Sequence, residues 1–218
     1  MFGNSSVIFQ FRGVFGVPVH IGSSIILLVL LFLSFGTSTA QLLYNAIFLG
    51  MVIGSIYLHE LGHAWATLIQ GIPVRRIMIY GGGGFCERTR SASVKQDELI
   101  VAMGPIVNLT IWAVASLVWP YMPEGILMWA VNLLAWINLF LAIFNMIPVQ
   151  PLDGGKLFQL VLMRFMSPGM ATRIAGGVGL VIAILWLPAM YLAYKYMGFL
   201  LFFFPPIGLH WQMLQRKV

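Results

Sequence analysis

The sequence predicts an all-α polytopic membrane protein with about six transmembrane helices and a small β-hairpin or sheet element. Of its 218 residues, 60% are hydrophobic and only 8% are charged, whereas a soluble domain carries about 25% charged residues. Apolar stretches also recur at about the 20-residue length that crosses a bilayer. The net charge of +6 does not indicate a nucleic-acid partner, because the basic residues are scattered and form no dense run.

The N-terminal part is expected to enter the membrane directly. Residues 1–20 alternate apolar with small or polar residues, which predicts a strand or interfacial segment, and residues 21–35 form the first span. Arg12, this apolar run and the small residues 38–40 together imitate a cleaved signal peptide. We favour an uncleaved span, because the segments that follow are themselves membrane-spanning.

A glycine-rich element interrupts the helical pattern after the second span, residues 42–69. Val74–Tyr80 is typical of a strand, and Gly81–Gly84 follows it, so a β-hairpin or sheet edge is expected beside the membrane. The four glycines form either a flexible loop or a place where another backbone approaches closely.

The rest of the chain predicts further spans, and we expect one membrane-embedded domain over residues 1–218. Gly104-Pro105 should interrupt the third span, and the prolines and glycines of residues 148–155 forbid a regular helix after the fourth. A short amphipathic helix is expected at 156–166. The expected third to sixth spans are 99–119, 126–147, 175–194 and 198–212, the last two being broken by Pro188 and by Pro205-Pro206.

The basic residues determine the expected orientation. With six spans, all 12 basic residues except Lys195 fall on one side, and the positively charged side is cytoplasmic. Both termini are then cytoplasmic, and we expect a bacterial inner membrane. His59 lies about 10 residues, or roughly 15 Å, from the cytoplasmic end of its span.

The second span carries two histidines that are four positions apart. His59-Glu60-Leu61-Gly62-His63 matches the His-Glu-x-x-His pattern of helical zinc sites. Positions i and i+4 lie roughly 40° apart on a helix, so both imidazoles leave from the same face. Glu60 lies about 100° round from His59, where it is better placed to handle an attacking water than to bind the metal. Ionisable residues within a span are costly and usually mark function.

A third metal ligand has few candidates, because the chain holds only six acidic residues. Catalytic zinc usually takes three protein ligands. The other acids outside the motif lie in loops or at span ends, where a solvated charge is expected. Asp153 stands in a tight Pro-x-Leu-Asp-Gly-Gly turn at a matching depth, so we predict it as the ligand. The alternative is an aspartate that only stabilises its turn.

These motifs together resemble the site-2 protease family of intramembrane zinc metalloproteases, in a compact form without a PDZ or CBS domain. The resemblance covers roughly residues 12–165 and rests on order and spacing. Its motifs are His59–Ala64, Gly104–Asn108, Asn145–Pro148 and Pro151–Gly155, with Phe15–His20 at the entry to the first span.

The resemblance implies the roles of several residues. His59, His63 and Asp153 would bind one Zn²⁺, Glu60 would be the general base, and spans two to four, within about residues 42–155, would form the catalytic core. Asn145 falls on a family asparagine that helps to hold substrate or the oxyanion.

Further substrate contacts are also predicted. Asn108 would lie near the substrate or Asn145, or else only at a helix–helix contact. The hairpin with Gly82 and Gly83 could clamp an unwound substrate by strand addition. His20 could contact the site but is more simply interfacial, and His210 is expected to have no functional role.

We therefore expect an enzyme that hydrolyses a peptide bond in or near the transmembrane segment of another protein, as in regulated intramembrane proteolysis. Its partners would be the lipid bilayer and a membrane-bound regulator, for example an anti-sigma factor. One alternative is a metal-ion transporter or receptor that uses the same histidines and aspartate, although transport needs no base after His59. Another is an inactive scaffold that binds transmembrane partners, against which the complete ligand set argues.

Overall fold

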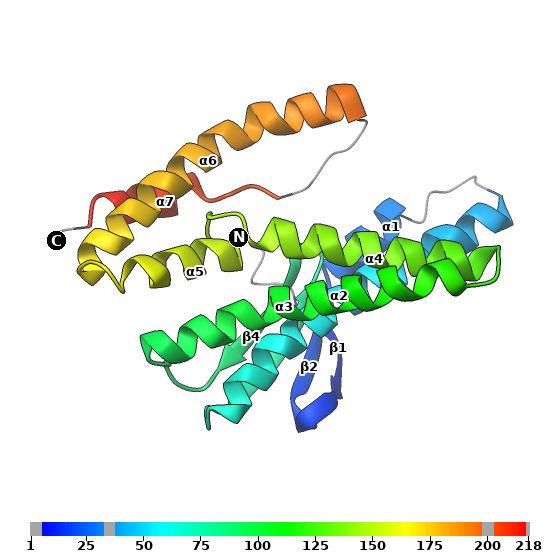
Figure 1. Cartoon of the computed structure of the whole chain (residues 1–218), viewed down its shortest axis with the longest axis horizontal. Helices are drawn as coiled ribbons and strands as arrows, with labels where there is room; N and C mark the ends of the chain where they lie inside the picture. Colours follow the sequence, from blue (N-terminus) through cyan, green and yellow to red (C-terminus); the bar gives the residue numbers. More distant parts are fainter. Residues whose placement is uncertain (1–5, 33–37, 198–202, 217–218) are drawn as a thin grey trace. The chain divides into compact units, whose positions relative to one another are not determined.

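The computed structural model describes residues 6–32, 38–197 and 203–216. The chain divides into two compact units, Met1–Ala142 and Ile143–Val218 (Figure 1). The first unit contains all four described strands and helices α1 (Ile25–Phe32), α2 (Thr39–Ile69), α3 (Val94–Val118) and most of α4 (Ile126–Asn145). The second unit contains α5 (Asp153–Leu162), α6 (Pro168–Met197) and α7 (Ile207–Leu214).

The expected hairpin is confirmed and is half of a four-stranded sheet. Its strands β1 (Val7–Arg12), β2 (Pro18–Gly22), β3 (Val74–Tyr80) and β4 (Gly83–Arg88) lie in the order β1-β2-β3-β4. The β1–β2 and β3–β4 pairs are antiparallel, whereas β2 and β3 are parallel. A parallel pair needs a long crossover connection, and α1 and α2 supply it.

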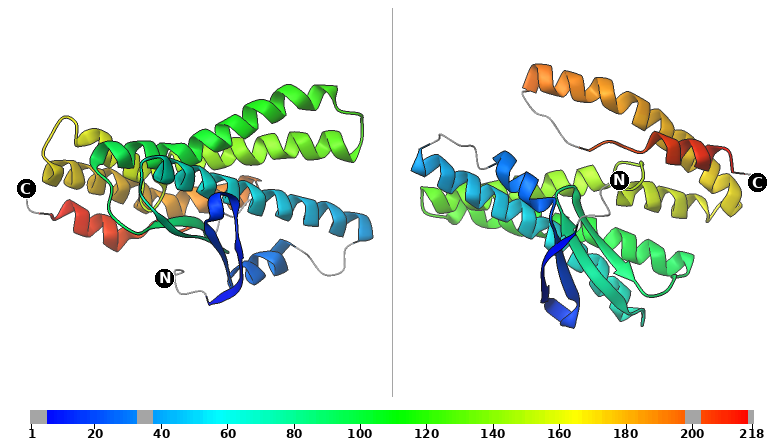
Figure 2. Two further views of the ribbon diagram at one scale, coloured as in Figure 1. Left: turned by 90° about the horizontal axis from the view of Figure 1, so that it is seen from below. Right: turned by 180° about the vertical axis from the view of Figure 1, so that it is seen from behind.

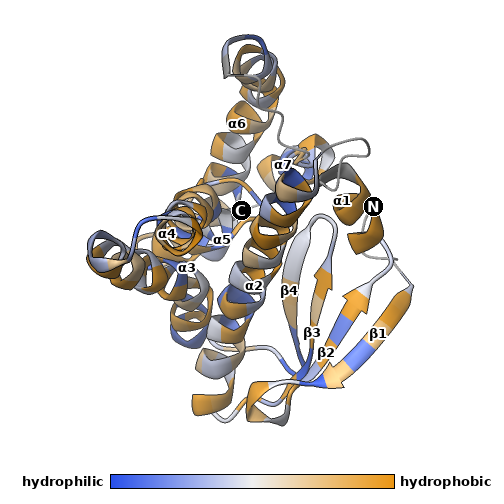
Figure 3. Ribbon diagram, turned by 90° about the vertical axis from the view of Figure 1, so that its right-hand side faces the viewer, coloured by the Kyte–Doolittle hydropathy of each residue, from blue (hydrophilic) through white to orange (hydrophobic). Residues whose placement is uncertain are grey.

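The sheet packs on one side of α2, as Figure 3 shows. Val19 of β2, Ile77 and Ile79 of β3 and Ala64 of α2 are buried in one apolar cluster. Fully burying an isoleucine side chain contributes about 2 kcal/mol relative to leaving it exposed. Because Ala64 follows directly after His63, this cluster sets the sheet beside the His-Glu-x-x-His segment.

Helix α3 does not break at Gly104-Pro105, so the expected interruption of the third span is wrong. Pro105 lies inside one continuous helix. Pro105 lacks an N–H, which removes one backbone hydrogen bond. Close packing against α2 compensates, because a Cβ added to Gly62 of α2 would lie 2.8 Å from the Met103 carbonyl oxygen. The N-terminus of α3 is held by a capping box between Ser93 and Gln96.

The second unit is also continuous where a break was expected. α6 runs through Pro188, and α5 begins at Asp153 instead of residue 156. α7 packs closely on α6, since a Cβ added to Gly176 would lie 2.7 Å from the Leu214 nitrogen. The two further views in Figure 2 show the helices of each unit from below and from behind.

Four helices of the described chain are long and apolar enough to cross a membrane, namely α2, α3, α4 and α6. The expected count of about six spans is not confirmed. Of the expected first span, residues 25–32 form α1, and its last part, residues 33–35, lies outside the described residues. Residues 198–202 of the expected sixth span also lie outside them, residues 203–206 are not helical, and α7 has eight residues.

Candidate metal centre

The two histidines of α2 face each other within the helix bundle. His59 and His63 are 5% and 8% exposed. Their Nε2 atoms lie 3.1 Å apart, and their rings are nearly perpendicular at 85°. The one-turn spacing on α2 therefore brings two ring nitrogens to one point, as the sequence pattern predicts.

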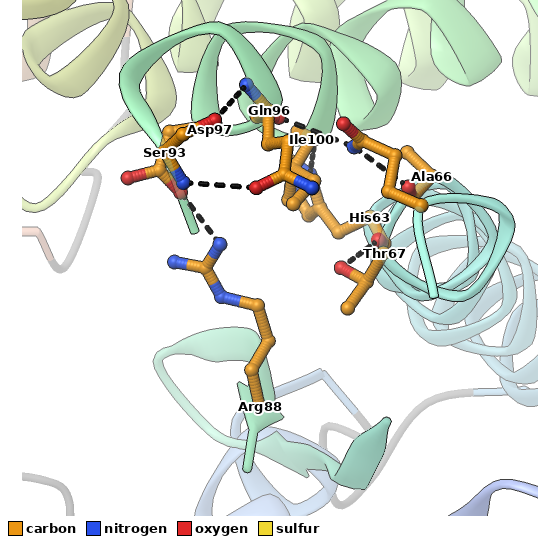
Figure 4. Close-up of polar contacts among 9 residues, drawn as sticks. His63, Ala66, Thr67, Arg88, Ser93, Gln96, Asp97 and Ile100 are labelled. Atoms are coloured by element: carbon orange, nitrogen blue, oxygen red, sulfur yellow. Dashed lines mark hydrogen bonds and ion pairs between the residues drawn. The ribbon is translucent and has the colours of Figure 1, made fainter. Parts of the chain in front are cut away.

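The outer nitrogen of each ring contacts an oxygen from α3. The Nδ1 atom of His59 lies 2.5 Å from Oδ1 of Asn108, and the Nδ1 atom of His63 lies 2.7 Å from the Ile100 carbonyl oxygen. Figure 4 shows His63 beside the first turns of α3. Because both oxygens are acceptors, each Nδ1 donates its proton and each Nε2 keeps its lone pair.

The pair of Nε2 atoms suits a metal ion. Two nitrogen lone pairs whose atoms lie 3.1 Å apart repel unless both bind one cation. Two histidine nitrogens at about 2.05 Å from a tetrahedral zinc ion would be about 3.3 Å apart. Hydrogen bonds from the outer nitrogens to protein oxygens are the usual support of metal-binding histidines.

Gly104 of α3 packs directly against the two nitrogens. A Cβ added there would lie 2.6 Å from Nε2 of His59 and would also overlap Nε2 of His63. Any side chain at position 104 would thus collide with both Nε2 atoms. The glycine therefore allows α3 to approach the histidine pair this closely.

Glu60 is 5% exposed and faces strand β4. A Cβ added to Gly84 would lie 2.6 Å from Cγ and 2.9 Å from Oε1 of Glu60. Burial, and then the Glu60 charge, raise the pKa of Tyr80, and the same two causes raise the pKa of Cys86 to about 12. Glu60 is thus held between α2 and the sheet, on a different side of the helix from the histidine nitrogens.

The predicted substrate glycines lie in and beside the β3–β4 turn. Gly82 is in the turn, and Gly83, which begins β4, has a φ of +127° that favours glycine. The glycine that touches Glu60 is Gly84, which the sequence did not distinguish from its neighbours.

Asp153 and Asn145 belong to the second unit. Asp153 is the first residue of α5, and Asn145 is the last residue of α4. A Cβ added to Gly154 would lie 2.6 Å from the Ile147 carbonyl oxygen, and one added to Gly155 would lie 2.5 Å from the Gln150 nitrogen. The two glycines therefore let the chain fold tightly back on itself just before and at Asp153.

His210, to which the sequence assigned no role, contacts this same turn. It is 1% exposed, and its Nε2 lies 3.2 Å from the Gln150 carbonyl oxygen. His20 lies on β2 opposite Met78 of β3.

Asn108, which the sequence placed either near the substrate or at a helix–helix contact, is fully buried between helices and contacts His59. Two further polar residues beside it were missed. Asn138 of α4 and Ser55 of α2 continue the contact away from the histidine. A signal for Asn138 was present, because a polar amide within the apolar stretch 126–145 is costly unless it is hydrogen-bonded.

A buried histidine pair with a neighbouring glutamate, on a helix that is long and apolar enough to span a membrane, is a candidate metal centre of an integral membrane protein. The family model described as Peptidase family M50 matches residues 47–124 and 120–186. The chain belongs to this family, that of the site-2 proteases.

The chain is similar to several curated proteins. It is 30% identical over 182 residues to the Synechocystis protein named "Putative zinc metalloprotease sll0528", covering 76% of this chain and 48% of that protein. It is 26% identical over 179 residues to Zinc metalloprotease MJ0392 of Methanocaldococcus jannaschii, covering 80% of this chain and 51% of that protein. The chain thus spans about half the length of these relatives.

One solved structure shares the fold. The Site-2 Protease from Methanocaldococcus jannaschii superimposes with a TM-score of 0.68 over 95% of this chain and 92% of that chain, at 23% sequence identity. At this identity the likeness shows that the arrangement of helices and strands is common to both.

Proposed function

We propose that this protein is an intramembrane zinc metalloprotease that hydrolyses a peptide bond in or near the transmembrane segment of another protein. The observation that carries the proposal is the His59–His63 pair, whose Nε2 atoms lie 3.1 Å apart while both Nδ1 atoms donate hydrogen bonds to oxygens of α3. Membership of Peptidase family M50 supports it, as do the names of the zinc metalloprotease relatives.

The proposed ligands are His59 and His63 of the first unit and Asp153 of the second. Two imidazoles and one carboxylate are a donor set that zinc takes in catalytic sites, with one position left for water. When bound, zinc supplies Lewis acidity that activates water and polarises the scissile carbonyl.

Glu60 acts as the general base. It takes a proton from the attacking water and returns it to the leaving amide nitrogen. Its burial against Gly84 excludes bulk water from the carboxylate and limits its rotamers. Asn145 would donate its amide N–H to the oxyanion or to the substrate backbone.

The substrate is a membrane protein whose helix must unwind before attack, since its amides are otherwise engaged in helical hydrogen bonds. β4 is the edge of the described sheet and carries Gly83 and Gly84. An extended substrate segment would pair with this edge by strand addition. Proline scanning of β4 should lower cleavage of a single-span substrate, and unchanged cleavage throughout the scan would exclude strand addition there.

The proposed setting is a bacterial inner membrane, with both termini and the metal centre toward the cytoplasm. This follows from the distribution of the basic residues, of which only Lys195 falls on the other side if the chain has six spans. Single cysteines placed near each terminus of a chain that lacks Cys86, labelled from one side of sealed vesicles, would test the orientation. Labelling of both termini from the periplasmic side would refute it.

The proposal is tested by the substitution Glu60→Gln in purified full-length protein with a single-span substrate. Cleavage should fall about 10²–10⁴-fold, the usual contribution of general acid–base catalysis, while bound zinc stays at one ion per chain. Native protein treated with a zinc chelator is the matched control and should lose cleavage together with its metal. Full cleavage by the Glu60→Gln variant would refute the assignment of the base.

A further inference from the structure

A line of buried polar side chains leads from His59 across three helices. Asn108 of α3 and Asn138 of α4 are 0% exposed, and Ser55 of α2 is 1% exposed. Oδ1 of Asn108 contacts Nδ1 of His59 at 2.5 Å, and Nδ2 of Asn108 lies 2.7 Å from Oδ1 of Asn138. Nδ2 of Asn138 in turn lies 3.0 Å from Oγ of Ser55, one turn before His59 on the same helix. The line therefore starts and ends on α2.

The hydrogen bonds of this line have one consistent direction. Asn138 donates from Nδ2 to Oγ of Ser55 and to the Leu134 carbonyl oxygen, at 3.0 and 2.9 Å. Its Oδ1 is therefore turned toward Asn108 and can only accept. Asn108 must then present its amide nitrogen to Asn138, and also to the Ser55 carbonyl oxygen at 3.5 Å, which leaves its oxygen for His59. Reversing either amide would place two donors or two acceptors face to face at a buried site, which is costly.

The direction matters because Asn108 determines which nitrogen of His59 holds the proton. An amide oxygen opposite Nδ1 requires the proton there and leaves Nε2 unprotonated, as metal binding demands. An amide NH₂ group opposite Nδ1 would favour the other tautomer and block the lone pair of Nε2. The orientation of one amide on α3 is thus controlled by groups on α4 and α2.

We propose that Asn138 and Ser55 are positioning residues for the metal ligand His59, acting through the orientation of the Asn108 amide. The inference rests on the proposed function only in taking His59 as a metal ligand. It goes beyond that function by assigning a role to residues that touch neither metal nor substrate.

A purely structural role for Asn138 makes a different prediction. Interhelical hydrogen bonds between polar side chains hold membrane helices together, so removing one would lower the thermal stability of the chain. It would not change the metal affinity or the ligand geometry of the remaining folded protein. Metal binding therefore separates the two roles.

The test compares Asn138→Leu with Asn132→Leu, a matched substitution at a half-buried position of the same helix. Zinc affinity is measured on full-length protein by competition with a chromophoric chelator, and ligand geometry by the visible spectrum of the Co²⁺-substituted protein. Substitutions behind a metal ligand typically cost 10–100-fold in affinity. We expect about a 10-fold loss and an altered Co²⁺ spectrum for Asn138→Leu, a smaller loss for Ser55→Ala, and neither change for Asn132→Leu.

A second background separates amide orientation from packing. In an Asn108→Asp variant both side-chain oxygens are acceptors, so this side chain has no wrong orientation toward His59, although its second oxygen then faces Oδ1 of Asn138, which Nδ2 of Asn108 meets at 2.7 Å in the native chain. Adding Asn138→Leu to that variant should cost much less zinc affinity than adding it to the native chain. An equal loss in both backgrounds would overturn the inference, as would a native zinc affinity and Co²⁺ spectrum in the single Asn138→Leu variant.

The outcome is independent of proteolysis. If native protein binds zinc through His59 but cleaves no membrane substrate, the proposed protease function fails while the positioning of His59 still stands on the affinity series. If cleavage is found but the Asn138 and Ser55 variants bind zinc as tightly as the native chain, only the positioning inference fails.

Discussion

Two regions hold the proposed ligands, and they do so in opposite ways. One is the contact between α2 and α3 around His59 and His63, called the helical wall below. The other is the turn that leads to Asp153. On the wall, the partners of the two imidazoles come from residues 49 and 37 positions away in the sequence. In the turn, Gly154 and Gly155 are packed against the backbone of residues 146–150, which lie only a few positions earlier in the sequence. The histidines are thus positioned by other helices, and the aspartate mainly by its own segment.

The difference shows what each region tolerates. The wall depends on side-chain hydrogen bonds and on the close approach of α2 and α3. Any substitution at the contact between these helices should therefore change the position of the histidines. The turn depends on the absence of Cβ atoms at two positions, so added side-chain volume there should change its backbone. Substitutions that add a single methyl group in each region are the most direct way to compare them.

The largest effect is expected for Gly104→Ala on the wall. The new methyl group would collide with both Nε2 atoms and displace the imidazoles, so zinc affinity should fall about 100-fold, the upper end of effects next to metal ligands. Zinc competition measures it. Gly50→Ala is the control, because a Cβ at position 50 of α2 meets nothing within 4 Å. Equal zinc affinity in the two variants would show that the metal does not bind beside Gly104.

Gly84→Ala should impair the proposed base Glu60 without affecting metal binding. The methyl group would push Glu60, since Cγ would lie 2.6 Å from it, and a displacement of about 1 Å can cost about 100-fold in rate. We expect cleavage to fall by 10–100-fold with zinc affinity unchanged, which kinetics and zinc competition measure together. A loss of zinc affinity as large as the loss of cleavage would mean that β4 supports the histidines instead.

A smaller loss of affinity is expected in the turn. Gly154→Ala places a Cβ 2.6 Å from the Ile147 carbonyl oxygen, and overpacking of this kind costs about 1–3 kcal/mol of folding stability. Because Asp153 is the neighbouring residue, zinc affinity should fall about 10-fold, a loss at the low end for residues behind a ligand. Gly208→Ala on α7, where a Cβ meets nothing within 4 Å, should change neither thermal unfolding nor zinc affinity. If Gly154→Ala lowers stability alone, Asp153 does not bind the metal.

Local periodicity was enough to predict the pieces of the site. A helix places residues four apart on one face, so the convergence of His59 and His63 could be read from their spacing alone. The strand Val74–Tyr80 and the glycine turn after it were also predictable, because both patterns are local. The exception is α3, which continues through Pro105 because α2 packs closely against it.

The sequence by itself determined the class of protein, the histidine pair, the neighbouring glutamate and the tight turn at Asp153, since each depends on a few consecutive residues. Only the tertiary structure decided that Asn108 contacts His59, that Asn138 and Ser55 orient it, and that Gly104 and Gly84 face the imidazoles and Glu60. These contacts depend on the rotation and depth of whole helices and strands against one another. The spacing within any one helix carries no information about that relation, because it is set by packing over residues far apart in the chain.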